Sequence, residues 1–97
     1  SAASNLIFAR GDHLVIPEED VLPGIVLFQL LSNINVFKID RRSPALDELV
    51  TFDEIILCGS GRGVASLATI PEIGWHCSSE KTFLKLRKTY ETVKART

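Results

Sequence analysis

The feature that most constrains the fold is an apolar strand that runs directly into a glycine-rich segment. Residues 53–58 (DEIILC) are the strongest candidate for a core strand, and residues 59–63 (GSGRG) follow at once. Three glycines in five residues let the main chain approach a ligand closely and aim N–H groups at it. A plain turn into a second strand over 64–70 is the simpler interpretation, because glycine is the ordinary turn residue.

Short apolar segments between turn residues make up the rest of the chain. The predicted elements are a hairpin over 5–9 and 13–16, an apolar helix from Pro23, a strand over 36–39, a short helix over 45–50 with Ser43 as N-cap, a turn over 71–75, and a helix from 78 to about 95. In the last helix Phe83, Leu86, Tyr90 and Val93 form one apolar stripe, and Lys85, Lys88 and Lys94 form a solvated face. Interleaved strands and helices predict an α+β fold, with residues 1–97 as one domain.

Composition excludes several classes of function. The 97 residues carry 11 basic and 12 acidic side chains, for a net charge of −1, which predicts neither a nucleic-acid partner nor a membrane surface. The apolar runs fall well short of the roughly 20 residues that a membrane helix needs.

The two cysteines lack the spacing of a zinc site, and free thiols favour the cytoplasm or an organelle matrix. Because the chain has no methionine, we expect it to be part of a longer one.

A second segment is suited to an anion. Residues 22–26 (LPGIV) begin the predicted apolar helix, where free N–H groups and the helix dipole favour a phosphate. Together with residues 59–63 this makes a phosphorylated cofactor worth considering, although neither segment is a Walker A or a dinucleotide motif. Residues 10–12 (RGD) are expected to form a turn. His76 is expected to pack or to lie in a loop, and Asp53 and Glu54 to end a surface loop.

The order of the segments resembles a known family. Residues 1–8 (SAASNLIF), 22–25 (LPGI), 52–57 (FDEIIL), 59–61 (GSG) and the last helix are similar to the C-terminal domain of class IV aminotransferases. These fold-type-IV pyridoxal-phosphate enzymes include branched-chain and D-amino-acid aminotransferases and 4-amino-4-deoxychorismate lyase. The resemblance covers nearly the whole chain. It implies a mixed sheet with flanking helices, pyridoxal 5'-phosphate as cofactor, an amino-acid substrate and a homodimer.

The resemblance also implies roles for individual residues. The implied cofactor-binding residues are Leu22 on the ring, Gly24, Ile25 and Val26 giving backbone N–H groups to the phosphate, Ser60 and Gly61 on the same phosphate, and Ala3 and Ser4 nearby. Arg62 is a candidate for binding a substrate carboxylate, although an exposed structural arginine is the favoured interpretation.

Two departures from the family pattern bear on activity. Val26 and Leu27 stand where the family usually has Thr-Arg, so one hydroxyl and one charge are missing. The family's Schiff-base lysine and the glutamate that pairs with the cofactor nitrogen correspond to no residue here. We therefore expect an N-terminal domain to supply them and this segment alone to be inactive. A non-catalytic remnant or binding module with the same fold, or a plain structural fragment, are the alternatives, and the sequence does not separate aminotransferase from lyase.

Overall fold

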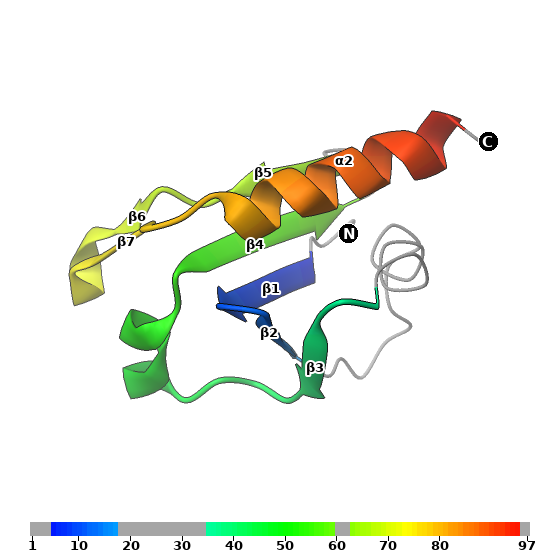
Figure 1. Cartoon of the computed structure of the whole chain (residues 1–97). Helices are drawn as coiled ribbons and strands as arrows, with labels where there is room; N and C mark the ends of the chain where they lie inside the picture. Colours follow the sequence, from blue (N-terminus) through cyan, green and yellow to red (C-terminus); the bar gives the residue numbers. More distant parts are fainter. Residues whose placement is uncertain (1–4, 18–34, 60–62, 96–97) are drawn as a thin grey trace.

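The computed structural model of the chain describes residues 5–17, 35–59 and 63–95 (Figure 1). In chain order the elements are β1 (Asn5–Arg10), β2 (His13–Ile16), β3 (Lys38–Arg41), the 3-10 helix η1 (Leu46–Thr51), β4 (Glu54–Gly59), β5 (Gly63–Ser66), β6 (Thr69–Ile70), the 3-10 helix η2 (Pro71–Ile73), β7 (Trp75–His76) and α2 (Lys81–Ala95). The described part of the chain contains no helix with the length and apolar character needed to cross a membrane.

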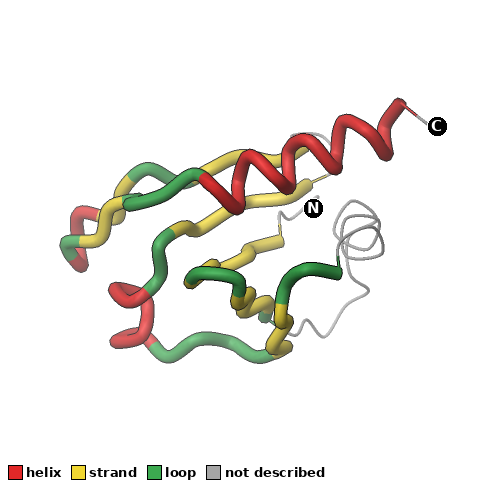
Figure 2. Tube along the Cα trace, in the orientation of Figure 1, coloured by secondary structure: helices red, strands yellow, loops and turns green. Residues whose placement is uncertain are grey.

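Five strands form one mixed sheet in the order β3-β2-β1-β4-β5. Strands β2 and β3 are parallel, and each of the other neighbouring pairs is antiparallel. Helix α2 runs along β4 and β5, while β6 and β7 form a separate hairpin at one end (Figures 1 and 2). The α+β class and the mixed sheet predicted from the sequence are therefore confirmed.

The first hairpin turns at Gly11, which has a φ of 61°. A left-handed φ of this kind costs glycine little and other residues more. The Gly11 N–H donates to Asp53 Oδ2 at 3.0 Å, and Arg10 pairs with His13 across the strands. The Arg10 guanidinium lies 5.0 Å from the centre of the Phe52 ring. Residues 10–12 thus form a structural turn, as the sequence predicted.

The two faces of the sheet carry separate apolar clusters, because successive side chains of a strand point to opposite sides. The cluster under α2 contains Ile7, Ala9, Leu14, Ile16, Ile56, Cys58 and Leu86, with Phe37, Val64, Phe83 and Tyr90 packed at its margin. The cluster on the other face contains Phe8, Val15, Phe52, Ile55 and Trp75. Leu86 and Val93 of α2 are buried, which confirms the predicted stripe, and Lys85, Lys88 and Lys94 are exposed as expected.

The predicted strand over 64–70 is wrong in one respect, because it is two strands in two sheets. Strand β5 leaves the main sheet after Ser66, and β6 then pairs with β7 across η2. Pro71 begins η2, where its missing N–H is not needed, and Gly74 ends it with a φ of 69°. Trp75 consequently belongs to a strand, although a turn was predicted there.

Two other boundaries differ from the prediction. Strand β3 covers 38–41 where 36–39 was expected, because the Lys38 N–H bonds to the Asp12 carbonyl at 3.0 Å and fixes the parallel register. The short helix is a 3-10 helix whose N-cap is Ala45 and not Ser43. Glu48 takes over part of the capping, since its carboxylate accepts the Ala45 N–H at 3.2 Å.

Candidate functional site

The candidate site is one end of the five-stranded sheet, where several strands begin or finish. We call this end the sheet edge. Strand β1 begins there at Asn5, which pairs with Cys58. Strand β4 ends there at Gly59, which pairs with Gly63 at the start of β5. Strand β2 also points to this edge and ends at Ile16, because it is antiparallel to β1. The chain therefore enters and leaves the sheet several times along a single edge.

All nine residues that the resemblance assigned to the cofactor or substrate lie outside the described residues. They are Ala3, Ser4, Leu22, Gly24, Ile25, Val26, Ser60, Gly61 and Arg62. The described flanks of residues 3–4 and 60–62 are Asn5, Gly59 and Gly63, which lie at this edge. The other four residues fall within 18–34, which has one described flank at this edge, Pro17 after Ile16, and a second flank, Asn35, that leads to Lys38 beside Asp12 at the opposite edge. The structure thus brings together the flanks of two predicted segments and one flank of the stretch that contains the third, and it leaves the roles of the nine residues as predictions.

Gly63 is the described end of the glycine-rich segment, and its backbone is in the left-handed region with a φ of 77°. A Cβ atom placed on it would lie 3.1 Å from Cε2 of Tyr90 on α2. The helix therefore covers this end of β5 closely, and glycine is needed there for both its φ and its small size. Apart from the apolar stripe of α2, no pattern in the sequence indicated this contact.

Glu54 was expected at the surface, but the structure buries it to 2% exposure at the start of β4. Its carboxylate accepts the backbone N–H of Thr82 at 2.9 Å and that of Phe83 at 2.8 Å. These N–H groups belong to the first turn of α2, which has no helical partners for them. Glu54 is thus a helix-capping residue whose partners are 28 and 29 positions away, and its carboxylate is not free for chemistry.

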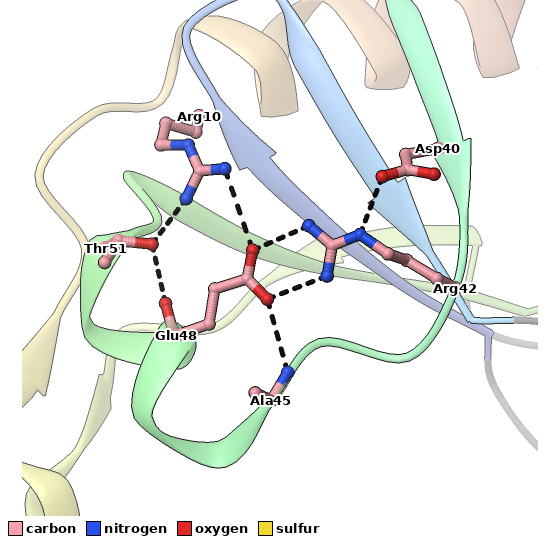
Figure 3. A network of polar contacts seen from close by, with 6 residues as sticks. All are labelled: Arg10, Asp40, Arg42, Ala45, Glu48 and Thr51. Carbon is pink, nitrogen blue, oxygen red and sulfur yellow. Dashed lines mark hydrogen bonds and ion pairs between the residues drawn. The ribbon is translucent and has the colours of Figure 1, made fainter.

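Four charged side chains form a network between the sheet and η1 (Figure 3). Arg42 donates to both Glu48 oxygens at 2.8 and 2.7 Å and to Asp40 at 2.6 Å. Arg10 lies 3.7 Å from the same Glu48 carboxylate. Hydrogen bonding by Arg42 lowers the pKa of Glu48 to about 2. The two arginines and the two carboxylates balance in charge, so this network holds η1 in place and is poorly suited to binding an anion.

The two cysteines and the nearby histidine do not form a reactive group. Cys58 is fully buried, as predicted, and burial raises the pKa of its thiol to about 12. Cys77 is half-buried and donates to the Ser79 carbonyl at 2.9 Å. His76 is exposed on β7. In the described part of the chain no three metal-ligating side chains come together.

The chain matches the model of the amino-transferase class IV family over residues 1–70. The chain belongs to the class IV aminotransferase family. A comparison with curated protein sequences found no match. Because the family match spans the first strands, β4 and the glycine-rich segment, it includes every part of the sheet edge described above.

Solved structures of class IV aminotransferases and related enzymes share the fold. The branched-chain aminotransferase of Thermoproteus uzoniensis, solved with norvaline, has 22% identity and a TM-score of 0.78, covering 92% of this chain and 31% of that one. The 4-amino-4-deoxychorismate lyase of Pseudomonas aeruginosa has 28% identity and a TM-score of 0.70, covering 88% and 32%.

A third relative was solved with the cofactor bound. The branched-chain amino acid aminotransferase of Thermobaculum terrenum, in its pyridoxal-phosphate holo form, has 21% identity and a TM-score of 0.76, covering 94% of this chain and 32% of that one. The fold is thus that of the fold-type-IV aminotransferases, as the resemblance implied. The chain spans about a third of the length of these structures.

Proposed function

We propose that this chain is the cofactor-phosphate half of a pyridoxal-phosphate enzyme, an aminotransferase or lyase that acts on amino-acid substrates. The observation that carries the proposal is the sheet edge at Asn5, Gly59 and Gly63, which flank the predicted segments at 3–4 and 60–62, and at which β2 ends before the stretch that contains the predicted segment at 22–26. Membership of the class IV family and the pyridoxal-phosphate form of one relative support it.

The described residues fit a phosphate group next to this edge. Gly59 and Gly63 close the β4–β5 connection as a pair without side chains, and the φ of 77° at Gly63 is one that glycine adopts readily. A main chain of this kind can bring N–H groups close to phosphate oxygens. The buried carboxylate of Glu54 does not lie beside this edge, because it is at the other end of β4, where it accepts hydrogen bonds from α2.

The residues of this chain have separate roles in the proposal. Ile25 and Val26, after Gly24, donate backbone N–H groups to the phosphate, and Ser60 adds its hydroxyl with Gly61 beside it. Leu22 packs on the ring, and Ala3 and Ser4 lie next to the cofactor. Arg62 is the candidate for the substrate carboxylate. These residues bind and orient; none of them transfers a proton.

The chemistry of the reaction depends on groups outside this chain. When bound, pyridoxal phosphate supplies an electron sink for bonds broken at the carbon that carries the substrate amine. The catalytic lysine and the carboxylate opposite the cofactor nitrogen come from an N-terminal domain in this proposal. The complete enzyme is a homodimer in the cytoplasm or an organelle matrix, and residues 1–97 alone are inactive.

The experiment is a denaturing intact-mass measurement on the full-length natural protein after borohydride reduction. We expect a mass increase equal to one reduced pyridoxyl group, located by peptide mapping on a lysine upstream of Ser1. Ser60→Ala should weaken cofactor binding. A full-length protein without such a lysine, or one that takes up no cofactor, would contradict the proposal and favour the non-catalytic binding module.

Both an aminotransferase solved with norvaline and an aminodeoxychorismate lyase share this fold, so the reaction is tested separately. Transamination of an amino acid with a 2-oxo acid, followed by chromatography of both products, identifies an aminotransferase. Release of pyruvate from aminodeoxychorismate without an amino acceptor identifies a lyase. The wild-type protein and the Arg62→Ala variant are compared in the assay that gives activity, and a higher KM in the variant would support the role of Arg62.

A further inference from the structure

Strand β5 is an outermost strand of the five-stranded sheet, and its long side away from β4 has no partner among the described strands (Figure 1). We call this the open side of β5. The Leu67 N–H donates to the Ile55 carbonyl at 2.9 Å, which fixes the phase of the ladder between β4 and β5. Bonded and non-bonded pairs alternate in an antiparallel ladder. Ala65 therefore bonds to β4, whereas Val64 and Ser66 direct their N–H and C=O groups to the open side.

The two outermost strands differ in their protection against a further strand. Strand β3 carries Lys38, Asp40 and Arg41, and charged side chains on an outermost strand discourage pairing with another segment. Strand β5 has the sequence GVAS, without charge or proline. Its residues are buried or half-buried, and α2 runs along it on one face (Figure 1). Strand β5 thus has the composition of an inner strand, although no described strand lies beyond it.

A row of apolar side chains leads to the open side of β5 on the sheet face away from α2. Leu6 of β1 lies opposite Leu57 of β4, which lies opposite Ala65 of β5. Although β1 and β4 are inner strands, Leu6 is 37% exposed and Leu57 is only half-buried. Neither leucine belongs to the apolar cluster of this face. The row and the open side therefore form one continuous surface that the described residues leave partly uncovered.

The size of the open side favours a segment of the same polypeptide over a separate molecule. Only Val64 and Ser66 present backbone groups there, which is little to offset the entropy lost when two molecules associate. A tethered segment loses much less, because its effective concentration is high. The solved relatives share this fold over about a third of their own length, so most of the chain of such a protein lies outside it.

We propose that an extended apolar segment of the natural polypeptide, outside residues 1–97, adds a strand to the open side of β5 and covers Leu6 and Leu57. This inference rests on the function proposed above only in that both require a polypeptide longer than residues 1–97. The added strand bonds to the N–H and C=O groups of Val64 and Ser66. Its side chains on the face of Leu57 are apolar, because they continue the row across the sheet.

Hydrogen exchange of the full-length natural protein, resolved to single amides, tests the added strand. The Val64 and Ser66 amides should exchange at least about a hundredfold more slowly than their intrinsic rates. Arg41 on β3 is the matched control. Because the Arg42 N–H bonds to the Ile16 carbonyl and alternate residues point the other way, the Arg41 N–H faces outward and should exchange near its intrinsic rate. Less slowing than a hundredfold at Val64 and Ser66 would overturn the inference.

Photo-crosslinking identifies the occupant. Leucine is replaced throughout the full-length protein by photo-leucine, which differs little in shape, and irradiated protein is separated on a denaturing gel before peptide mapping. We expect Leu6 or Leu57 to be joined to a residue outside 1–97 in the band of monomer mass. If neither is joined to such a residue, or if the link connects two chains, the inference is wrong.

A pair of substitutions measures the burial of the row. Leu6 and Ile39 are apolar strand residues with similar exposure within this chain, 37% and 39%. In the full-length protein Leu6→Lys should lower the Tm by at least about 4 °C more than Ile39→Lys, since only Leu6 is covered by the added segment. An equal loss in the two variants would contradict the inference. Hydrogen exchange and crosslinking, which use the unsubstituted chain, decide the question if Leu6→Lys does not fold.

The outcomes separate this inference from the proposed function. A full-length protein that binds pyridoxal phosphate while Val64 and Ser66 exchange freely overturns only the added strand. A full-length protein that protects both amides and takes up no cofactor overturns only the proposed function. A natural protein that consists of residues 1–97 alone overturns both.

Discussion

The carboxylate of Glu54 accepts the backbone N–H of Thr82 at 2.9 Å in a site where both residues are buried. The other carboxylate oxygen accepts the N–H of Phe83 at 2.8 Å. Strand β4 is thereby joined to the first turn of α2 by two charge-assisted hydrogen bonds. The same strand ends at Gly59 and the same helix carries Tyr90, so this pair of bonds orients both partners of the candidate site.

Replacing Glu54 should therefore destabilise the fold. In Glu54→Gln one N–H keeps a carbonyl acceptor while the other faces an amide NH2, so we expect a loss of about 1–3 kcal/mol in the free energy of unfolding. Glu54→Ala should cost more, because both N–H groups lose their acceptor. Urea unfolding followed by Trp75 fluorescence measures this. Glu72→Gln, at an exposed carboxylate on η2, is the control and should stay within about 0.5 kcal/mol of wild type.

The sequence predicted those elements whose signal is local. The Gly11 hairpin follows from turn residues between two apolar runs, and the α2 stripe from helical spacing. Glu54 could not be placed, since the residues it caps lie 28 and 29 positions further along the chain. The division of 64–70 into β5 and β6 depends on pairing with β4 and β7, which no pattern within the segment encodes.

The candidate site was also predictable only where its sequence signal is local. The glycines of residues 59–63 are a local signal, and the structure confirms a strand-to-strand connection there, closed by Gly59 and Gly63. The resemblance added the other predicted cofactor residues. Tyr90 was assigned only to the core stripe, because helical spacing tells which face of α2 is buried but not which backbone lies under each side chain.

Gly63 should tolerate a methyl group less well than Gly74. Both have positive φ, so alanine carries a backbone cost of roughly 1–2 kcal/mol at either position. Only at Gly63 would the new Cβ also press on a ring, at 3.1 Å from Tyr90. We expect Gly63→Ala to lose about 1 kcal/mol more than Gly74→Ala in urea unfolding. Adding Tyr90→Leu to both variants should reduce this difference, and an equal loss in the two alanine variants would contradict the contact.

The Glu48 network should make the protein sensitive to strong acid. The Glu48 pKa is lowered by Arg42 from 4.5 to about 2 in the folded protein. The pair consequently stabilises the fold above pH 4.5, and the stabilisation is lost as the pH falls from there through about 2. Urea unfolding at several pH values should show a steeper acid loss for wild type than for Glu48→Gln. Parallel curves for the two proteins would show that the pair does not contribute.

The two thiols should differ strongly in reactivity in the folded protein. Because the thiolate is the reactive form and burial raises the Cys58 pKa to about 12, Cys58 should resist a thiol reagent at pH 8 until the chain unfolds. Half-buried Cys77 should be labelled in the native protein and Cys58 only after urea unfolding, which peptide mapping of the label at these two positions distinguishes. In Cys77→Ser the native label should disappear. Rapid native labelling of Cys58 in the Cys77→Ser variant would show that the core around β4 opens readily. The same pKa also predicts a pH dependence of the free energy of unfolding. Because burial raises the pKa of the Cys58 thiol from 9.0 to about 12, the stability that this thiol contributes should be lost as the pH rises from 9.0 through about 12.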